Sequence, residues 1–126
     1  MSDKDIQMEV LLDHYRSPRN YGKVNNPSAE LVEYNPVCGD AVQFSFKVEG
    51  GKIEEIKFIG RGCSISQGSA SMLTEMVQGM TIEEAASISP EAVLARIGLD
   101  LGPSREKCAL LSLNALHKMI RKYGEK

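Results

Sequence analysis

The sequence predicts an α+β protein in which helices pack on one face of a small antiparallel β-sheet. Three observations lead to this prediction. Apolar residues recur at helical spacing over Asp5–Tyr15. Apolar and polar residues then alternate over Val42–Val48, which is typical of a strand with one buried face. From Gln67 onward the apolar pattern is helical again, and helices and strands that occupy separate parts of a chain indicate the α+β class.

The alternating segment is expected to form the first arm of a β-hairpin. Gly50-Gly51 provides the turn, and Ile53–Ile59 returns as the antiparallel second arm. The apolar pattern of this arm changes phase between Ile53 and Ile56, which indicates a β-bulge or an early strand start. A further short strand is expected at Ala29–Tyr34.

The second half of the chain carries several helix start signals. A helix is expected from Gln67 to Gly79, followed by a capping-box pattern at Thr81-Ile82-Glu83-Glu84. Ser89-Pro90-Glu91 repeats the start signal, with Pro at the first helical position. Gly98–Ser104 is expected to be a loop, and the last helix to run from about Arg105 to Tyr123.

Composition indicates one ordinary globular domain spanning residues 1–126. The chain is 42% hydrophobic and 25% charged, with a net charge of -2. This charge gives no reason to expect binding to nucleic acid or to an anionic membrane surface. The opening Met-Ser-Asp-Lys-Asp lacks the apolar region of a secretory signal, and no apolar run is long enough to span a bilayer. We therefore expect a cytoplasmic protein.

The three cysteines lie in unusual local sequences. An odd number cannot all pair within one chain, and a reducing compartment would keep them as thiols. Cys38 lies in a turn before the first hairpin strand, where Gly39 gives the backbone freedom to bring Cys38 and Asp40 toward one site. Cys63 lies between a strand end and a helix start, and Cys108 lies in about the first turn of the final helix.

These surroundings favour chemistry over simple core packing. Helix N-termini and basic neighbours favour thiolate over thiol, and thiolate binds soft metals and attacks sulfur. Arg61 is next but one to Cys63, and Arg105 and Lys107 precede Cys108. The alternative is that the cysteines are small buried residues, as free cysteine often is. Together Cys38, Asp40, Cys63 and Cys108 offer three thiolates and a carboxylate, a set that suits zinc or the iron of a cluster.

Several motifs resemble a known family. Asp13-His14-Tyr15-Arg16-Ser17-Pro18-Arg19-Asn20 is similar to the N-terminal signature of the IscU/NifU-type iron–sulfur cluster assembly scaffolds. Asn35-Pro36-Val37-Cys38-Gly39-Asp40 and Gly62-Cys63-Ser64-Ile65-Ser66 resemble their first two ligand motifs, and Ser69–Glu75 resembles the helix that follows. The resemblance covers nearly the whole chain, with all three cysteines in order.

The resemblance implies an IscU/SufE-like fold and a scaffold that is not itself an enzyme. Such a protein assembles a labile [2Fe–2S] cluster with sulfur from a cysteine desulfurase of the IscS, NifS or SufS type, and passes the cluster to acceptor apoproteins. Carried over, Cys38, Asp40, Cys63 and Cys108 are the cluster and metal ligands, with Asp40 as the labile one. Cys108 is our predicted persulfide acceptor, and zinc is an alternative occupant of the cluster-free site.

The third motif departs from the common bacterial scaffold. Leu101–Cys108 replaces the Leu-Pro-Pro-Val-Lys chaperone-binding segment, so the resemblance gives no ground for docking of an Hsp70-type chaperone. Lys107 stands where the family has His, and Arg105-Glu106-Lys107-Cys108 resembles the SufU group of zinc-dependent sulfurtransferases. In that alternative Cys38 would accept the persulfide. SufU proteins carry an extra segment between the second and third cysteines, whereas only 44 residues intervene here, so we interpret the chain as a scaffold.

The two histidines are not predicted to be ligands. His14 lies within the N-terminal motif, where a structural or partner-contact role is expected. His117 follows Cys108 by nine positions, about 180° around a helix of 3.6 residues per turn, so we expect it to face away from the site and to be exposed to solvent.

Overall fold

A computed structural model describes residues 3–36 and 39–125 of the chain. Its sheet has three antiparallel strands in the order β1 (Ala29–Asn35), β2 (Asp40–Glu49) and β3 (Lys52–Arg61). The five helices in the described residues are α1 (Asp3–Arg16), α2 (Ser64–Val77), α3 (Ile82–Ala86), α4 (Pro90–Ile97) and α5 (Pro103–Gly124). The α+β prediction is confirmed.

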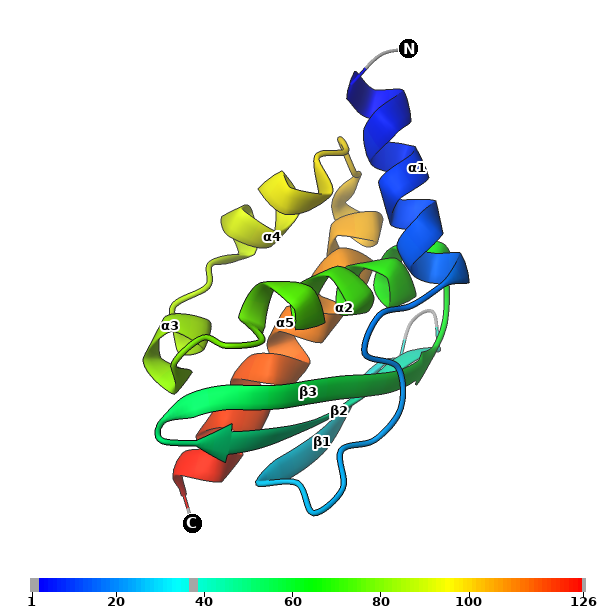
Figure 1. The fold of residues 1–126 in the computed structure, drawn as a ribbon. Coiled ribbons are helices and arrows are strands. Elements are labelled where there is room, and N and C mark those ends of the chain that lie inside the picture. Colours follow the sequence, from blue (N-terminus) through cyan, green and yellow to red (C-terminus); the bar gives the residue numbers. More distant parts are fainter. Residues whose placement is uncertain (1–2, 37–38, 126) are drawn as a thin grey trace.

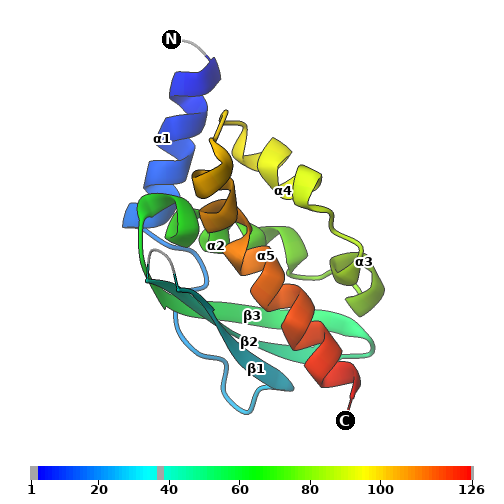
Figure 2. The ribbon, with the colours of Figure 1, turned by 180° about the vertical axis from the view of Figure 1, so that it is seen from behind.

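The core lies between the sheet and the two long helices α2 and α5, which cover the same face of the sheet (Figures 1 and 2). The inward-facing residues of β2 and β3, among them Phe44, Phe46, Ile56 and Phe58, are fully buried. Alternation along these strands puts every second side chain into this core. Burial of these large side chains is the main source of stability, at about 1.5–3 kcal/mol each.

The predicted β-bulge is present in β3. Lys47 pairs with Glu55 and Val48 pairs with Ile53, so Glu54 has no partner in the register. The extra residue lets Ile53 and Ile56 both point into the core, where both are fully buried. The phase change in the sequence therefore marks the bulge.

The remaining helices pack on other helices. Helix α1 contacts α2, and α3 and α4 contact α5. The Thr81 capping box and the Ser89 cap with Pro90 both form as predicted. The segment between α1 and β1 crosses the other face of the sheet (Figure 1), where the buried Val24 donates its backbone N–H to Ser45 Oγ at 2.9 Å.

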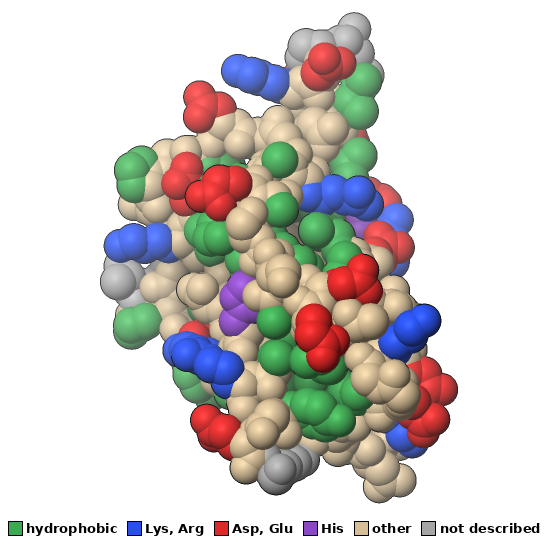
Figure 3. Space-filling model, turned by 90° about the vertical axis from the view of Figure 1, so that its left-hand side faces the viewer, with side chains coloured by type: hydrophobic (Ala, Val, Ile, Leu, Met, Phe, Trp, Pro, Cys, Tyr) green, Lys and Arg blue, Asp and Glu red, His purple; other side chains and the backbone are tan. Residues whose placement is uncertain are grey.

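The surface carries the mixture of charged and apolar side chains that the composition indicates. In the side view of Figure 3, acidic and basic side chains are interspersed around a band of hydrophobic ones. No helix among the described residues is long and apolar enough to cross a membrane.

Candidate metal and cluster site

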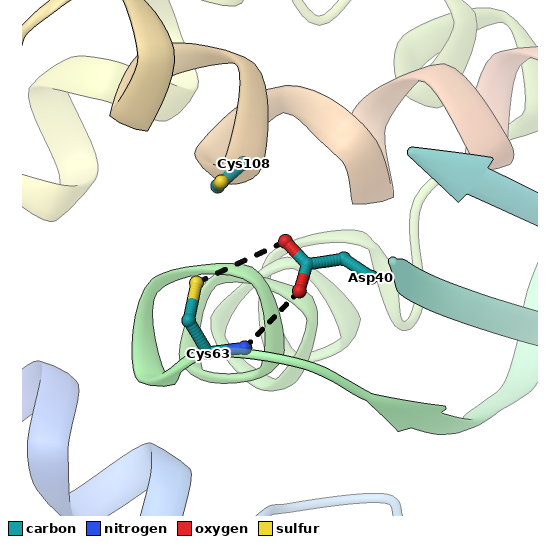
Figure 4. A group of neighbouring side chains, drawn as sticks. All are labelled: Asp40, Cys63 and Cys108. Carbon is teal, nitrogen blue, oxygen red and sulfur yellow. Dashed lines mark hydrogen bonds between the residues drawn. The ribbon is translucent and has the colours of Figure 1, made fainter. Parts of the chain in front are cut away.

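Asp40 and Cys63 meet at one end of the sheet. Asp40 is the first residue of β2, and the pairing of Ala41 with Arg61 places it opposite the end of β3. The Cys63 backbone N–H donates to Asp40 Oδ1 at 3.2 Å, and Cys63 Sγ lies 3.9 Å from Asp40 Oδ2 (Figure 4). A hydrogen bond from Cys63 thus holds the Asp40 side chain at the start of β2.

Cys63 caps helix α2. Its Sγ accepts a hydrogen bond from the backbone N–H of Ser66 at 3.5 Å, and Ser66 Oγ donates to the Cys63 carbonyl at 3.2 Å. The prediction that Cys63 lies at a helix N-terminus is therefore confirmed, although α2 begins at Ser64 and not at Gln67. The sulfur faces the positive end of the helix dipole and is exposed to solvent.

Cys108 reaches the same place from α5. The helix begins at Pro103, so Cys108 lies in its second turn, and the prediction of a first-turn position is wrong by about one turn. One ligand atom each from Asp40, Cys63 and Cys108 lies within 4.8 Å of the others. Residues that are 23 and 45 positions apart in sequence thus converge on a group that suits a metal ion. Cys38, the fourth predicted ligand, lies outside the described residues.

The donor set fits zinc or iron. Thiolates and a carboxylate are established ligands of Zn²⁺, and cysteine thiolates are the usual ligands of iron–sulfur clusters. Asp40 is only 2% exposed, and a buried carboxylate needs partners or a cation. The backbone N–H of Cys63 supplies one hydrogen-bond partner, and a bound metal ion would supply the cation.

A groove of about 560 Å³ opens beside Cys63 and Cys108. Its walls come from α1, the start of α2, the loop before α5 and α5 itself. Besides the two cysteines, apolar and charged residues line it in nearly equal number: Lys4, Asp5, Met8, Leu11, Ser64, Ile65, Leu99, Asp100, Leu101 and Arg105. The contribution of α1 was not predicted, because no signal in its sequence indicates which surface it covers.

The two basic residues that precede Cys108 in the chain line different hollows of the surface. Arg105 lines the groove together with Cys108, the cysteine beside which it was expected, and with Cys63. Lys107 lines a separate depression with Asn35 and Pro36. Lys107 therefore lies toward the segment that precedes Cys38.

Gln67 is a positioning residue that the sequence reasoning missed. Its side chain is buried, and its Nε2 lies within hydrogen-bond distance of the Ala41 and Arg61 carbonyls, at 3.4 and 3.1 Å. Gln67 thereby ties the ends of β2 and β3 to α2, directly behind the site. A Gly60 side chain would collide with it, because a Cβ there would lie 2.3 Å from Gln67 Oε1. A polar residue on a buried helix face was the available signal.

Neither histidine lines the groove. His14 is buried, with Nδ1 2.8 Å from Ser71 Oγ and Nε2 3.4 Å from Glu75. Burial lowers the pKa of His14, and the positive charge of Arg19 lowers it further. The expected structural role fits these contacts. His117 was predicted to be exposed, and this is wrong: it is half-buried, and its Nε2 has no hydrogen-bond partner among the described residues.

His117 is covered because neighbouring elements pack against its side of α5. It lies with Glu33 of β1 and Ala86 of α3 around a shallow depression. Helical spacing gives the direction of a side chain but does not show which elements lie there.

The fold and the site define a class of small α+β proteins in which thiols and a carboxylate converge on a candidate metal site at one end of the sheet. Residues 6–126 match the model of the NifU-like N-terminal domain. The chain belongs to this family, which includes the IscU and SufU proteins of iron–sulfur cluster assembly.

Two relatives and one solved structure illustrate the family. The chain is 40% identical to the zinc-dependent sulfurtransferase SufU of Bacillus subtilis, over 93% of this chain and 90% of that protein. It is 39% identical to the iron–sulfur cluster assembly scaffold protein IscU 1 of Archaeoglobus fulgidus, over 94% of this chain and 76% of that protein. A crystal structure from Fervidobacterium islandicum, described as a scaffold for the SUF system, superposes with a TM-score of 0.78 at 27% identity, covering 94% of this chain and 99% of that one.

Proposed function

We propose that this protein is a scaffold on which a labile [2Fe–2S] cluster is assembled before transfer to acceptor apoproteins. Cys38, Asp40, Cys63 and Cys108 hold the cluster, and a cysteine desulfurase supplies its sulfur as a persulfide on Cys108. The scaffold has no turnover of its own. The cluster is therefore its cargo and not a resident cofactor.

The length correspondence with the two relatives carries this proposal. The alignment with the Archaeoglobus scaffold spans 118 positions, which equals about 94% of this chain, so it has almost no gaps. The alignment with the Bacillus sulfurtransferase spans 134 positions but only 93% of this chain, about 117 residues. Roughly 17 positions of that alignment therefore have no counterpart here. The close match in length over the aligned part of the Archaeoglobus scaffold supports the scaffold proposal.

The local geometry suits a protein that releases its cargo. Asp40 offers a hard oxygen ligand among soft sulfurs, and such a ligand holds iron less firmly than thiolate does. Cys63 is exposed at the rim of the groove. An acceptor thiol could therefore reach the Cys63 side of the cluster without unfolding of the scaffold.

A zinc-dependent sulfurtransferase is the second candidate, and Lys107 favours it. Lysine replaces the histidine that the resemblance to the common scaffold implies, so no imidazole ligand is present beside Cys108. Zinc would then occupy the same ligands, and Cys38 would accept the persulfide. The two candidates thus share their ligands and differ in metal and in the sulfur-accepting cysteine.

Anaerobic metal and sulfide analysis, with a visible spectrum, distinguishes the candidates. The scaffold is expected to contain iron and acid-labile sulfide in equal amounts and to show cluster absorbance. Colourless protein with one zinc per chain after anaerobic isolation would reject the scaffold in favour of the sulfurtransferase. The anaerobic step is necessary because an empty thiolate site takes up zinc.

Ligand variants provide the control. Cys38→Ser, Cys63→Ser and Cys108→Ser should each lose cluster absorbance, because an alcohol is a poor iron ligand compared with thiolate. Asp100→Ala changes an exposed carboxylate of the same groove and should retain the cluster. Full cluster content in all three serine variants would place the site elsewhere.

A further inference from the structure

Two sulfur atoms from different elements lie close together in the site. Cys63 Sγ at the start of α2 and Cys108 Sγ on α5 are within 4.8 Å of each other. A disulfide requires sulfurs about 2 Å apart, so a side-chain movement of roughly 3 Å would join them. Cys63 is exposed at a helix cap and Cys108 is half-buried. The Cys63 sulfur is therefore accessible to solvent, and the Cys108 sulfur is partly covered on α5.

We propose that Cys63 is the resolving thiol that releases sulfide from a persulfide on Cys108. This inference rests on the proposed function, which makes Cys108 the sulfur acceptor. Cys63 Sγ attacks the inner sulfur, Cys108 Sγ, and a bond forms between these two atoms. The bond between Cys108 Sγ and the outer sulfur breaks, and the outer sulfur leaves as sulfide.

The step balances without an external reductant. A persulfide and a thiol give a disulfide and hydrogen sulfide, and the proton of the Cys63 thiol leaves with the sulfide. The outer sulfur is reduced by two electrons, and the two cysteine sulfurs are oxidised to the disulfide. A dithiol reductant then restores both thiols before cluster ligation. Persulfide delivered by the desulfurase thereby becomes the sulfide that the cluster needs.

The contacts of Cys63 hold its sulfur beside Cys108. The Ser66 N–H donates to Cys63 Sγ from one side at 3.5 Å, and Asp40 Oδ2 lies 3.9 Å from it on another. Figure 4 shows the Cys63 and Asp40 side chains below the turn of α5 that carries Cys108. Exchange between thiols and disulfides needs the two sulfurs to meet and depends on access, and the groove provides that access.

The direction of attack decides the product. Attack on the inner sulfur gives sulfide and a Cys63–Cys108 disulfide. Attack on the outer sulfur would move the persulfide to Cys63 and release nothing. The structure places the inner sulfur, Cys108 Sγ, within reach of Cys63, so we infer attack at that atom.

The test uses full-length, metal-free, reduced protein under anaerobic conditions. The protein is treated with one equivalent of glutathione persulfide, without other reductant, and is then alkylated. Released sulfide is measured over time, and peptide mass spectrometry locates the disulfide and any added sulfur. The wild type should release close to one sulfide per chain and form the Cys63–Cys108 disulfide.

Single variants separate the roles of the cysteines. Cys63→Ser should keep the added sulfur on Cys108 and release sulfide more than about 100-fold more slowly, because a thiol positioned in the same molecule has a large effective concentration. Serine is a preferred N-cap residue, so this variant should keep α2 capped and fold. Asp100→Ala, which changes an exposed carboxylate of the same groove, should release sulfide at the wild-type rate.

Three results would overturn the inference: wild-type release from Cys63→Ser, a disulfide that contains Cys38, or added sulfur on Cys63. A wild type that builds a cluster from iron and inorganic sulfide but keeps its persulfide would refute this inference alone. A wild type that releases sulfide but builds no cluster would refute the scaffold function alone.

Discussion

Substitution of Gly62 tests the geometry of the site most sharply. Gly62 joins β3 to Cys63 with a φ of +145°, in a region that residues with a side chain rarely adopt. A Cβ at this position would lie 2.2 Å from Asp40 Oδ1 and 2.7 Å from Ser66 Oγ. Gly62→Ala must therefore displace the carboxylate or change the backbone that carries Cys63.

The expected magnitude has two parts. A residue with a side chain in such a backbone conformation costs about 1–3 kcal/mol. Displacing the buried Asp40 carboxylate from the Cys63 N–H costs about 1–3 kcal/mol more. Gly62→Ala should thus lower the free energy of unfolding by about 2–6 kcal/mol. It should also weaken zinc binding by about 10–100-fold, the typical effect of losing the contacts that orient a metal ligand.

Urea unfolding of the reduced, metal-free protein measures the first effect, and competition with a zinc indicator measures the second. Gly79→Ala is the matched control, because Gly79 has a φ of +91° but open space around its Cβ position, far from the ligands in the chain. It should cost about 1–3 kcal/mol and leave zinc affinity unchanged. The reasoning fails if Gly62→Ala binds zinc as the wild type does, or is no less stable than Gly79→Ala.

Three further predictions concern other parts of the molecule. Burial lowers the pKa of His14, so the unfolded chain takes up a proton near pH 6.5 before the folded one does. The free energy of unfolding should be highest above about pH 6.5 and should fall as the pH drops below that value. His14→Gln should remove this dependence on pH when unfolding by urea is measured across the same pH range. Thr81→Ala removes the capping box and should lower the free energy of unfolding by about 1 kcal/mol. Thr81→Ser should lower it little, and equal losses in the two variants would show that the cap does not contribute. Asp40→Ala should still acquire a cluster but transfer it to an apo-ferredoxin more slowly than wild type, followed by circular dichroism at matched loading, with Asp100→Ala at the wild-type rate. Unchanged transfer by Asp40→Ala would show that Asp40 does not control release.

The sequence predicts elements well where apolar residues repeat. The alternation in Val42–Val48 and the phase change between Ile53 and Ile56 correspond to β2 and to the bulge in β3. Boundaries are less exact where polar residues begin an element. Ser64 and Ser66 show no apolar period, and the cap is a cysteine, which is not a usual capping residue.

The start of α5 was predicted two residues late. Pro103 follows Gly102, and Pro is favoured at the first position of a helix. A helix that begins at Pro103 has Cys108 in its second turn. Cys108 therefore lies beyond the first turn of α5, within which the effect of the helix dipole falls off.

The site itself depends on contacts that no local pattern contains. Residue types and the family resemblance nominate Asp40, Cys63 and Cys108, but their convergence requires α5 to cross the sheet end where Asp40 lies. The same applies to the groove wall made by α1 and to the buried side of His117. These features arise from how elements pack together, and a periodic pattern gives only the face that each element buries.

Transfer of a cluster to an apo-ferredoxin tests the scaffold function most directly. The protein is loaded anaerobically with iron and sulfide, separated from free ions, and mixed with apo-ferredoxin in the presence of a chelator that captures free iron. The scaffold proposal predicts that holo-ferredoxin forms in proportion to the cluster supplied, and faster than from the same amounts of free iron and sulfide. A loaded protein that yields holo-ferredoxin no faster than the free ions, or that cannot be loaded at all, would contradict the proposal.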